Sequence, residues 1–230
     1  MRGRILDSYL PNGDKMQKKT TTLIYGTGNA GKLDLMRHYL GTLQEIRLLG
    51  LKDLPFCWGE IEECGKDPLE NARQKALAYY RICGQPVFSQ DSGLYIEGLP
   101  KERQPGVHVR RVNGVNLTDE QMRKYYKKIA AEFGGRCVAQ YQNAICLVFS
   151  ENEIYEARGG ALNWKKFWLM TEERPQRMEG FPLDAICADY RTGRHFYDGE
   201  ATMPEEEGDG VRDFFRNALK QHEMRNKIEK

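Results

Sequence analysis

The sequence predicts an α/β fold built on a mixed β-sheet, and two patterns support this prediction. Short apolar runs of strand length, such as residues 23–25 and 46–49, alternate with longer segments whose apolar residues recur at helical spacing. In the second half, residues 137–149 and 154–157 are apolar runs separated by a few polar residues, which predicts an antiparallel hairpin. Strands joined through helices usually pair in parallel, so we expect both kinds of pairing in one sheet.

Length and composition are typical of a globular protein. The chain has 230 residues, and 35 lysines and arginines nearly balance 33 aspartates and glutamates. This balance argues against a protein that coats a nucleic-acid polymer, because such proteins are strongly basic. No apolar run approaches the roughly 20 residues of a membrane span, and six scattered cysteines without a Cys-x-x-Cys pair indicate a reducing cytoplasm. We expect residues 1–20 to form an extension and residues 21–230 a single domain.

The first motif with chemical content is Thr27-Gly28-Asn29-Ala30-Gly31-Lys32, between the strand predicted at 23–25 and a helix predicted over 31–40. Backbone N–H groups at a helix N-terminus bind phosphate, glycine allows a close approach, and Lys32 adds a positive charge. Read from Gly26, the spacing also matches a Walker A loop, but Leu33 stands where that loop needs a Ser or Thr for magnesium. A P-loop ATPase and a plain strand–turn–helix corner remain alternatives.

Helix signals divide the rest of the chain. Asp67-Pro68-Leu69-Glu70 predicts an N-cap followed by a capping box, with the helix ending at Gly84. Residues 118–121 form a second capping box, which starts a helix that Gly134-Gly135 ends. A last helix is predicted from about residue 211, with fraying expected beyond residue 221.

Two further stretches carry charged groups that suit a binding site. Asp91-Ser92-Gly93 lies between two short apolar runs, which predicts a carboxylate at a strand end beside a glycine turn. Such a carboxylate can hold a hard cation, although an ordinary turn has the same pattern. Arg110 and Arg111 lie on a predicted loop, and residues 185–187 are a later apolar run predicted as a strand.

Four stretches of the chain carry a family resemblance when they are taken together in order. They are Thr27 to Lys32, Glu62-Glu63 with Glu70-Asn71-Ala72 and Lys75, Asp91 to Leu94 with Pro105-Gly106-Val107, and Gly180-Phe181 with Asp184 and Met203-Pro204. This ordered set resembles the inosine triphosphate pyrophosphatase family, also called Ham1-like. The resemblance implies an elongated α/β fold of two lobes around a cleft, usually a homodimer. It also implies magnesium-dependent cleavage of a nucleoside triphosphate, such as the non-canonical purines ITP and XTP, to the monophosphate and pyrophosphate.

The resemblance also implies roles for individual residues. Glu63 and Asp91 would hold Mg²⁺, and Asp91 would also activate the attacking water. Lys75 lies off the apolar stripe of its predicted helix, where a solvated position is the simpler expectation. The remaining contacts implied are Thr27, Gly28, Asn29, Lys32, Lys75, Ser92 and Arg110 or Arg111 on the phosphates, and Phe181 and Asp184 at the base.

The stretches that would contact the base in this family differ from the family pattern here. The family has a lysine after the Met-Pro stretch and then a Ser-His-Arg triplet, whereas here residues 205–207 are glutamates and Asp213-Phe214-Phe215 stands near the triplet. Arg212 and Arg216 are the candidates to replace it. Ionised glutamates offer no donor to a keto oxygen, so we expect a changed or relaxed base preference. The alternatives are a pyrophosphatase for a pyrimidine or modified triphosphate, and a nucleotide-binding or regulatory protein without turnover.

Overall fold

The computed structural model describes residues 20–55, 57–59, 61–198 and 208–228. Within these residues, seven strands form one mixed sheet in the order β2-β1-β3-β6-β8-β9, with β7 also paired to β6. β1 pairs in parallel with β2 and β3, and the remaining pairs are antiparallel, which confirms the predicted α/β fold with a mixed sheet. The strands are β1 (Thr21–Tyr25), β2 (Ile46–Gly50), β3 (Val87–Ile96), β6 (Arg136–Ser150), β7 (Glu153–Arg158), β8 (Phe167–Met170) and β9 (Cys187–Asp189).

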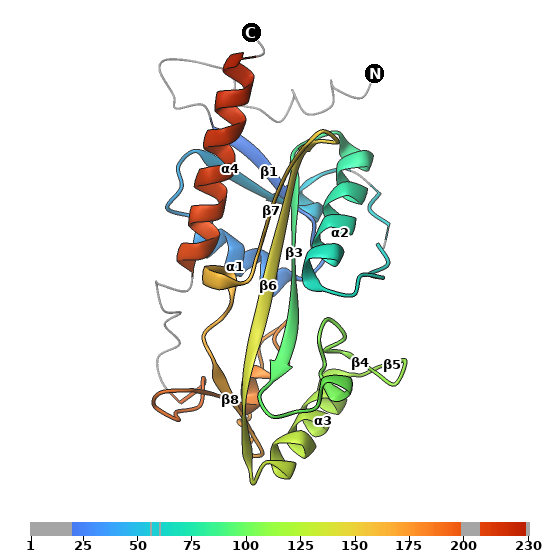
Figure 1. Ribbon diagram of the computed structural model, residues 1–230, viewed down its shortest axis with the longest axis vertical. Coiled ribbons are helices and arrows are strands. Elements are labelled where there is room, and N and C mark those ends of the chain that lie inside the picture. The colour runs from blue at the N-terminus through green and yellow to red at the C-terminus, as the bar shows by residue number, and fades with distance from the viewer. Residues whose placement is uncertain (1–19, 56, 60, 199–207, 229–230) are drawn as a thin grey trace.

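Four α-helices cover the sheet, and the molecule is elongated along β3 and β6 (Figure 1). α1 (Ala30–Leu40), α2 (Pro68–Cys83) and α4 (Asp209–Ile228) lie around one end of these two strands, and α3 (Asp119–Glu132) lies at the other end. α1 and α4 share one apolar cluster with β1 and β3, whereas α3 packs in a separate cluster with β8 and β9. β3 and β6 therefore connect two packed regions.

Aromatic side chains form the centre of the α1–α4 cluster. The rings of Tyr25 and Phe88 stack with centroids 4.6 Å apart, and Phe215 of α4 meets Phe88 edge-on at 4.8 Å. All three are at most 1% exposed. Full burial of an aromatic side chain contributes about 2 kcal/mol, so this trio anchors α4 on the sheet.

The predicted helix starts are present, with one difference. Asp67 caps α2 by accepting hydrogen bonds from the backbone N–H groups of Leu69 and Glu70 at 2.8 and 2.9 Å. Glu70 does not complete the predicted capping box, because its carboxylate accepts from the N–H of Lys66 at 2.7 Å instead. At α3, Thr118 forms the complete box that the sequence predicts.

The prediction of a turn at Asp91-Ser92-Gly93 is wrong. These residues lie inside β3, which pairs with β6 without interruption from Val87 to Ile96. A Cβ on Gly93 would lie 3.2 Å from the backbone carbon of Gly106, so this glycine permits a close approach of two backbone segments. The carboxylate of Asp91 therefore extends from the middle of a strand.

Other element boundaries also differ from the prediction. The apolar run 185–187 is divided between a 3₁₀ turn (Asp184–Ile186) and β9, and β8 was not predicted. α4 continues to Ile228 instead of fraying beyond residue 221, because His222 stacks on Phe149 at 3.8 Å and contacts Glu153 at 2.8 Å. None of the described helices is long and apolar enough to cross a membrane. Residues 1–19 of the predicted extension lie outside the described residues.

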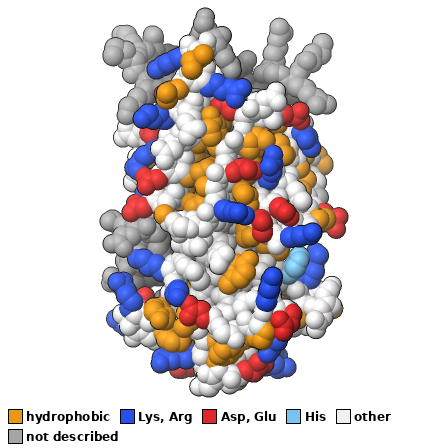
Figure 2. All heavy atoms as spheres, viewed as in Figure 1, with side chains coloured by type: hydrophobic (Ala, Val, Ile, Leu, Met, Phe, Trp, Pro, Cys, Tyr) orange, Lys and Arg blue, Asp and Glu red, His pale blue; other side chains and the backbone are white. Residues whose placement is uncertain are grey.

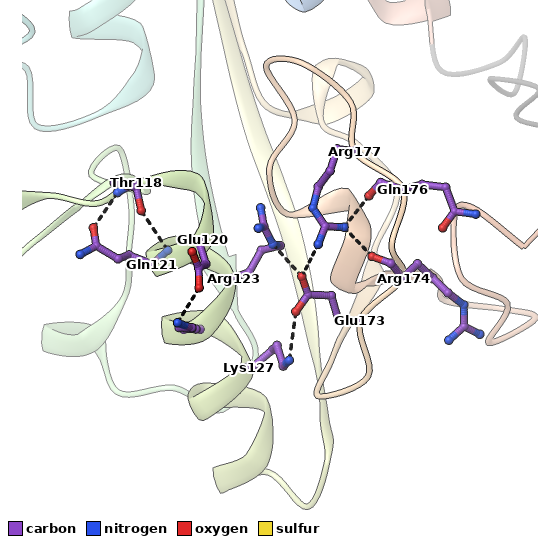
Figure 3. Close-up of polar contacts among 10 residues, drawn as sticks. Thr118, Glu120, Gln121, Arg123, Lys127, Glu173, Arg174, Gln176 and Arg177 are labelled. Carbon is purple, nitrogen blue, oxygen red and sulfur yellow. Dashed lines mark hydrogen bonds and ion pairs between the residues drawn. The ribbon is translucent and has the colours of Figure 1, made fainter.

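An ion-pair cluster fastens the segment after β8 to α3 (Figure 3). The carboxylate of Glu173 accepts from Arg123 at 2.8 Å, from Lys127 at 3.1 Å and from Arg177 at 2.7 Å. The side chain of Arg123 is only 10% exposed, so water screens this contact weakly. The same segment continues to residues 180–184, whose position therefore depends on the cluster.

We expect Glu173→Gln to lower the free energy of unfolding by about 2 kcal/mol, because it leaves the poorly solvated Arg123 without its anion. Urea unfolding measures the change. Glu120→Gln is the matched control, because Glu120 pairs with Lys124 at a site where both side chains are more than 60% exposed. Equal losses in the two variants would contradict the structural role of Glu173.

Candidate active site

A cavity of about 320 Å³ contains most of the residues that the sequence analysis selected. Its walls come from the start of α1, the middle of β3, the first turn of α3 and residues 180–184. A second hollow of about 450 Å³ between β7 and α4 contains none of them, so its size does not make it the better candidate. The predicted residues that line the first cavity are Asn29, Lys32, Glu63, Asp91, Ser92, Arg110, Phe181 and Asp184.

The glycine-rich corner is ordered by Asn29, the N-cap of α1. Its Oδ1 accepts from the backbone N–H of Lys32 at 3.0 Å, and its Nδ2 donates to the carbonyl of Gly180 at 3.4 Å. Thr27 supports the turn by accepting from the N–H of Asn29 at 3.2 Å. Thr27 and Gly28 do not line the cavity wall. The helix start and the segment around Gly180 are therefore held together directly.

Leu33 does not face this cavity. Its side chain packs against the α1–α4 apolar cluster, and a Cβ on Gly50 of β2 would lie 2.5 Å from its Cδ2. The hydroxyl at this position of a P-loop has to face the bound magnesium ion, whereas the side chain of Leu33 is directed at β2. This geometry argues against the P-loop alternative.

Two carboxylates from separate elements meet at Lys75. The Nζ of Lys75 lies 2.5 Å from Oε1 of Glu63 and 3.7 Å from Oδ1 of Asp91. The side chain of Lys75 is only 13% exposed, so the expectation of a solvated position is wrong. A long loop places Glu63 and a central strand places Asp91, and α2 carries the lysine between them.

The donor set fits a hard cation. No group of three or more His, Cys, Asp or Glu suited to a metal occurs in the described part of the chain, and the two carboxylates that meet at Lys75 are Glu63 and Asp91. Mg²⁺ suits such a site, because it binds proteins through one or two carboxylates and takes its other ligands from water and phosphate. Glu63 and Asp91 are the residues that would hold it.

Positive charge lines the cavity next to these carboxylates. Burial lowers the pKa of the Lys32 amine, repulsion from Lys75 lowers it further, and Asp91 and Glu63 oppose the shift. On the face of the molecule shown in Figure 2, Lys and Arg are interspersed with Asp and Glu. Among the described residues, the cations that line the cavity are Lys32 and Arg110.

Aromatic side chains line one end of the cavity, formed by Trp164, Phe181 and Tyr141. The ring of Trp164 stacks beside that of Phe181 with centroids 6.2 Å apart and meets Tyr141 edge-on at 5.2 Å. Trp164 and Tyr141 were not predicted from the sequence, because neither belongs to a local motif. The backbone N–H of Trp164 donates to the carbonyl of Tyr141 at 3.1 Å, a contact between distant segments that no spacing indicates.

The arginines proposed for the substrate differ in position. Arg110 lines the cavity, where its guanidinium donates to the carbonyl of Leu117 at 3.0 Å and to Asp119 at 2.7 Å. Arg111 lies in the hairpin of β4 (Arg111–Val112) and β5 (Val115–Asn116), donates to Asn116 at 3.4 Å, and does not line the cavity. Arg110 is therefore the better placed of the two.

The arginines of α4 do not reach the cavity. Arg212 donates to Asp209 at 2.5 Å and to the carbonyl of Tyr39 at 3.5 Å, and Arg216 donates to Asp213 at 3.1 Å. Neither lines the cavity, so their positions give no support to the idea that they replace the missing base contacts. Residues 203–207, which include the Met-Pro stretch and the three glutamates, lie outside the described residues.

Asp184 places a carboxyl group at the aromatic end of the cavity, where burial raises its pKa to about 7. A raised pKa means that the folded protein binds this proton more tightly than the unfolded chain does. The stability that results is present below the ordinary pKa of 3.8 and is lost as the pH rises through 7.

The free energy of unfolding of the parent should therefore fall relative to that of Asp184→Asn as the pH rises from about 4 to about 8. Urea unfolding of both proteins across this range measures the difference. A difference that is constant with pH would contradict the raised pKa.

Comparison with known proteins places this geometry in a family. The sequence model of the Ham1 family matches residues 23–163. A dITP/XTP pyrophosphatase of Geobacter sulfurreducens is 40% identical over 100 residues, which are 44% of this chain and 48% of that protein. A dITP/XTP pyrophosphatase of Deinococcus deserti is 32% identical over 143 residues, which are 61% of this chain and 64% of that protein.

A solved structure supports the same assignment at the level of fold. The HAM1 protein of Coxiella burnetii superposes with a TM-score of 0.62 at 23% identity, over 89% of this chain and 100% of that one. The matched segments span less than two thirds of the length of the Geobacter and Deinococcus relatives. The family model nevertheless covers more than half of the chain, so this protein belongs to the Ham1 family.

Proposed function

We propose that this protein hydrolyses a nucleoside triphosphate to the monophosphate and pyrophosphate in a magnesium-dependent reaction. The observation that supports this most directly is the meeting of Glu63 and Asp91 at Lys75, in the wall of a cavity that Lys32 also lines. Its relatives named dITP/XTP pyrophosphatase support the same chemistry.

In this proposal the triphosphate lies between α1 and α2. The helix start at Asn29 offers backbone N–H groups to the phosphate oxygens, and Lys32 and Lys75 neutralise their charge. Ser92, the neighbour of Asp91 on the same strand, also lines the cavity and offers a hydroxyl donor. Thr27 and Gly28 shape the corner, and Arg110 extends the positive charge toward α3.

The chemical step needs positioning and charge neutralisation more than covalent help. Water adds to the α-phosphorus, its proton passes to the carboxylate of Asp91, and the bond from the α-phosphorus to the bridging oxygen breaks to release pyrophosphate. Glu63 and Asp91 would hold a magnesium ion, which would neutralise phosphate charge and acidify bound water. Lys75, 3.7 Å from Asp91, is placed to stabilise the charge that develops on the phosphates.

The base lies at the aromatic end of the cavity in this proposal, where Phe181 and Trp164 offer faces for stacking. Asp184 presents a carboxyl group there, and no arginine of α4 lines the same wall. A non-canonical purine such as ITP or XTP, or a related nucleotide, fits the family. We expect the base preference to be relaxed, because no described residue is assigned as a cationic donor to a keto oxygen of the base.

A pyrimidine or modified triphosphate is the alternative substrate, and binding without turnover is the alternative function. The homodimer that the resemblance implies and a cytoplasmic location stay predictions.

Asp91→Asn should lower turnover by about a hundredfold or more while nucleotide affinity changes little, because the amide keeps the shape but accepts no proton. Pyrophosphate release measures the first quantity and calorimetric titration with a non-hydrolysable triphosphate the second. Ser89→Ala, which removes a buried contact of the same strand with the carbonyl of Gly26, controls for general loss of structure. Release of orthophosphate by the parent would favour the P-loop alternative, and no turnover on any triphosphate would favour a binding protein.

A panel of ITP, XTP, dUTP and the four common ribonucleoside triphosphates should give pyrophosphate release rates within about tenfold of one another, because Lys32 and Arg110, the cations that line the described part of the cavity, are assigned to the phosphates in this proposal. The ratio kcat/KM for each nucleotide is the measurement. A sharp preference for ITP and XTP over all others would contradict the relaxed base preference and leave the reaction itself supported.

A further inference from the structure

Asn71 is a buried amide that touches both halves of the proposed metal site. It is 1% exposed, and its Nδ2 donates to Oδ2 of Asp91 at 3.0 Å. Its Oδ1 accepts from the backbone N–H of Gly65 at 2.8 Å, two residues after Glu63. A single side chain thus connects the strand that carries one carboxylate with the loop that carries the other.

The loop that follows Glu63 is held along α2 by consecutive contacts. The backbone N–H groups of Cys64, Gly65 and Lys66 donate to the side chains of Gln74, Asn71 and Glu70 at 3.3, 2.8 and 2.7 Å. Among these three side chains, only Asn71 also reaches Asp91. Removing Gln74 or Glu70 therefore loosens the loop alone, whereas removing Asn71 also releases Asp91.

The contact leaves no room for a side chain at position 65. A Cβ on Gly65 would lie 2.5 Å from Oδ1 of Asn71 and 2.8 Å from its backbone nitrogen. Asn71 and Lys75 are four residues apart on α2, so both project from the same face toward β3. Glycine at 65 is required for the loop to approach this face.

The chemistry of an amide suits a carboxylate that binds metal. The neutral amide of Asn71 orients Asp91 by donating to its Oδ2, and it leaves the negative charge of the carboxylate in place. The other oxygen of Asp91, Oδ1, faces the amine of Lys75 at 3.7 Å. Residues that hydrogen bond to metal ligands in this way commonly change metal affinity by 10–100-fold when they are removed. Metal affinity changes in such cases because the hydrogen bond fixes the orientation of the carboxylate that binds the metal.

We propose that Asn71 is a positioning residue that holds the carboxylates of Glu63 and Asp91 on one divalent cation. The proposal rests on the function proposed above only in the identity of the two metal ligands. Asn71 contacts neither substrate nor metal in this role and acts through Asp91 and through the loop at Gly65.

The test measures the binding of Mn²⁺ alone to the full-length protein without nucleotide. The electron paramagnetic resonance signal of free Mn²⁺ reports how much of the ion remains unbound. Asn71→Ala should raise the Kd for Mn²⁺ by about tenfold or more and raise the Mg²⁺ concentration for half-maximal pyrophosphate release by a similar factor. Gly65→Ala leaves the asparagine in place but displaces the loop, and it should weaken Mn²⁺ binding in the same direction.

Two controls separate this role from loss of stability. Gln74→Ala removes a loop contact that does not reach Asp91, and Asn143→Ala removes a buried asparagine whose Nδ2 donates to the carbonyl of Leu162 at 2.7 Å. Asn143→Ala should leave the Kd for Mn²⁺ within about twofold of the parent value, and Gln74→Ala, which loosens the loop without releasing Asp91, should raise the Kd less than Asn71→Ala does. If folded Asn71→Ala and Gly65→Ala bind Mn²⁺ as the parent does, this inference is wrong and the proposed function stands. If the parent binds no Mn²⁺, both fail.

Discussion

The antiparallel pairing of β3 with β6 is the constraint on which the rest of the molecule depends. It runs unbroken from Val87 opposite Val148 to Ile96 opposite Ala139, and it crosses from the α1–α4 cluster to the α3 cluster. Asp91 and Ser92 lie near its midpoint, so their side chains project where the two packed regions meet. A rigid strand carries these groups, which fixes them more firmly than a loop would.

Under the proposed function, the cavity has to meet two opposing electrostatic requirements. A polyphosphate needs cations close to its oxygens, and a divalent cation needs carboxylates close to the same oxygens. Here Lys75 lies between Glu63 and Asp91, and Lys32 lines the wall next to them. Opposite charges are thus interleaved within one cavity, while the outer face mixes both signs.

The sequence predicted the parts that depend on local pattern. The helix caps at Asp67 and Thr118, the hairpin of β6 and β7, and the mixed sheet all follow from spacing and composition. The turn at Asp91 was predicted wrongly, because a glycine inside a strand has the same local signature as a glycine in a turn. Trp164 and the bridging role of Asn71 depend on contacts between segments far apart in the chain, which no local pattern encodes.

The hydrogen bond from Asn29 to the carbonyl of Gly180 joins the first turn of α1 to the segment that carries Phe181 and Asp184. A Cβ on Gly31 would lie 2.7 Å from the ring of Phe181, so this ring packs directly against the backbone of α1 at Gly31. Under the proposed function, the pocket for the base and the anchor for the phosphate chain are therefore physically coupled. A lineage that reshapes this pocket for a new nucleobase must then readjust the phosphate anchor at the same time, which limits how gradually such a change of substrate can evolve.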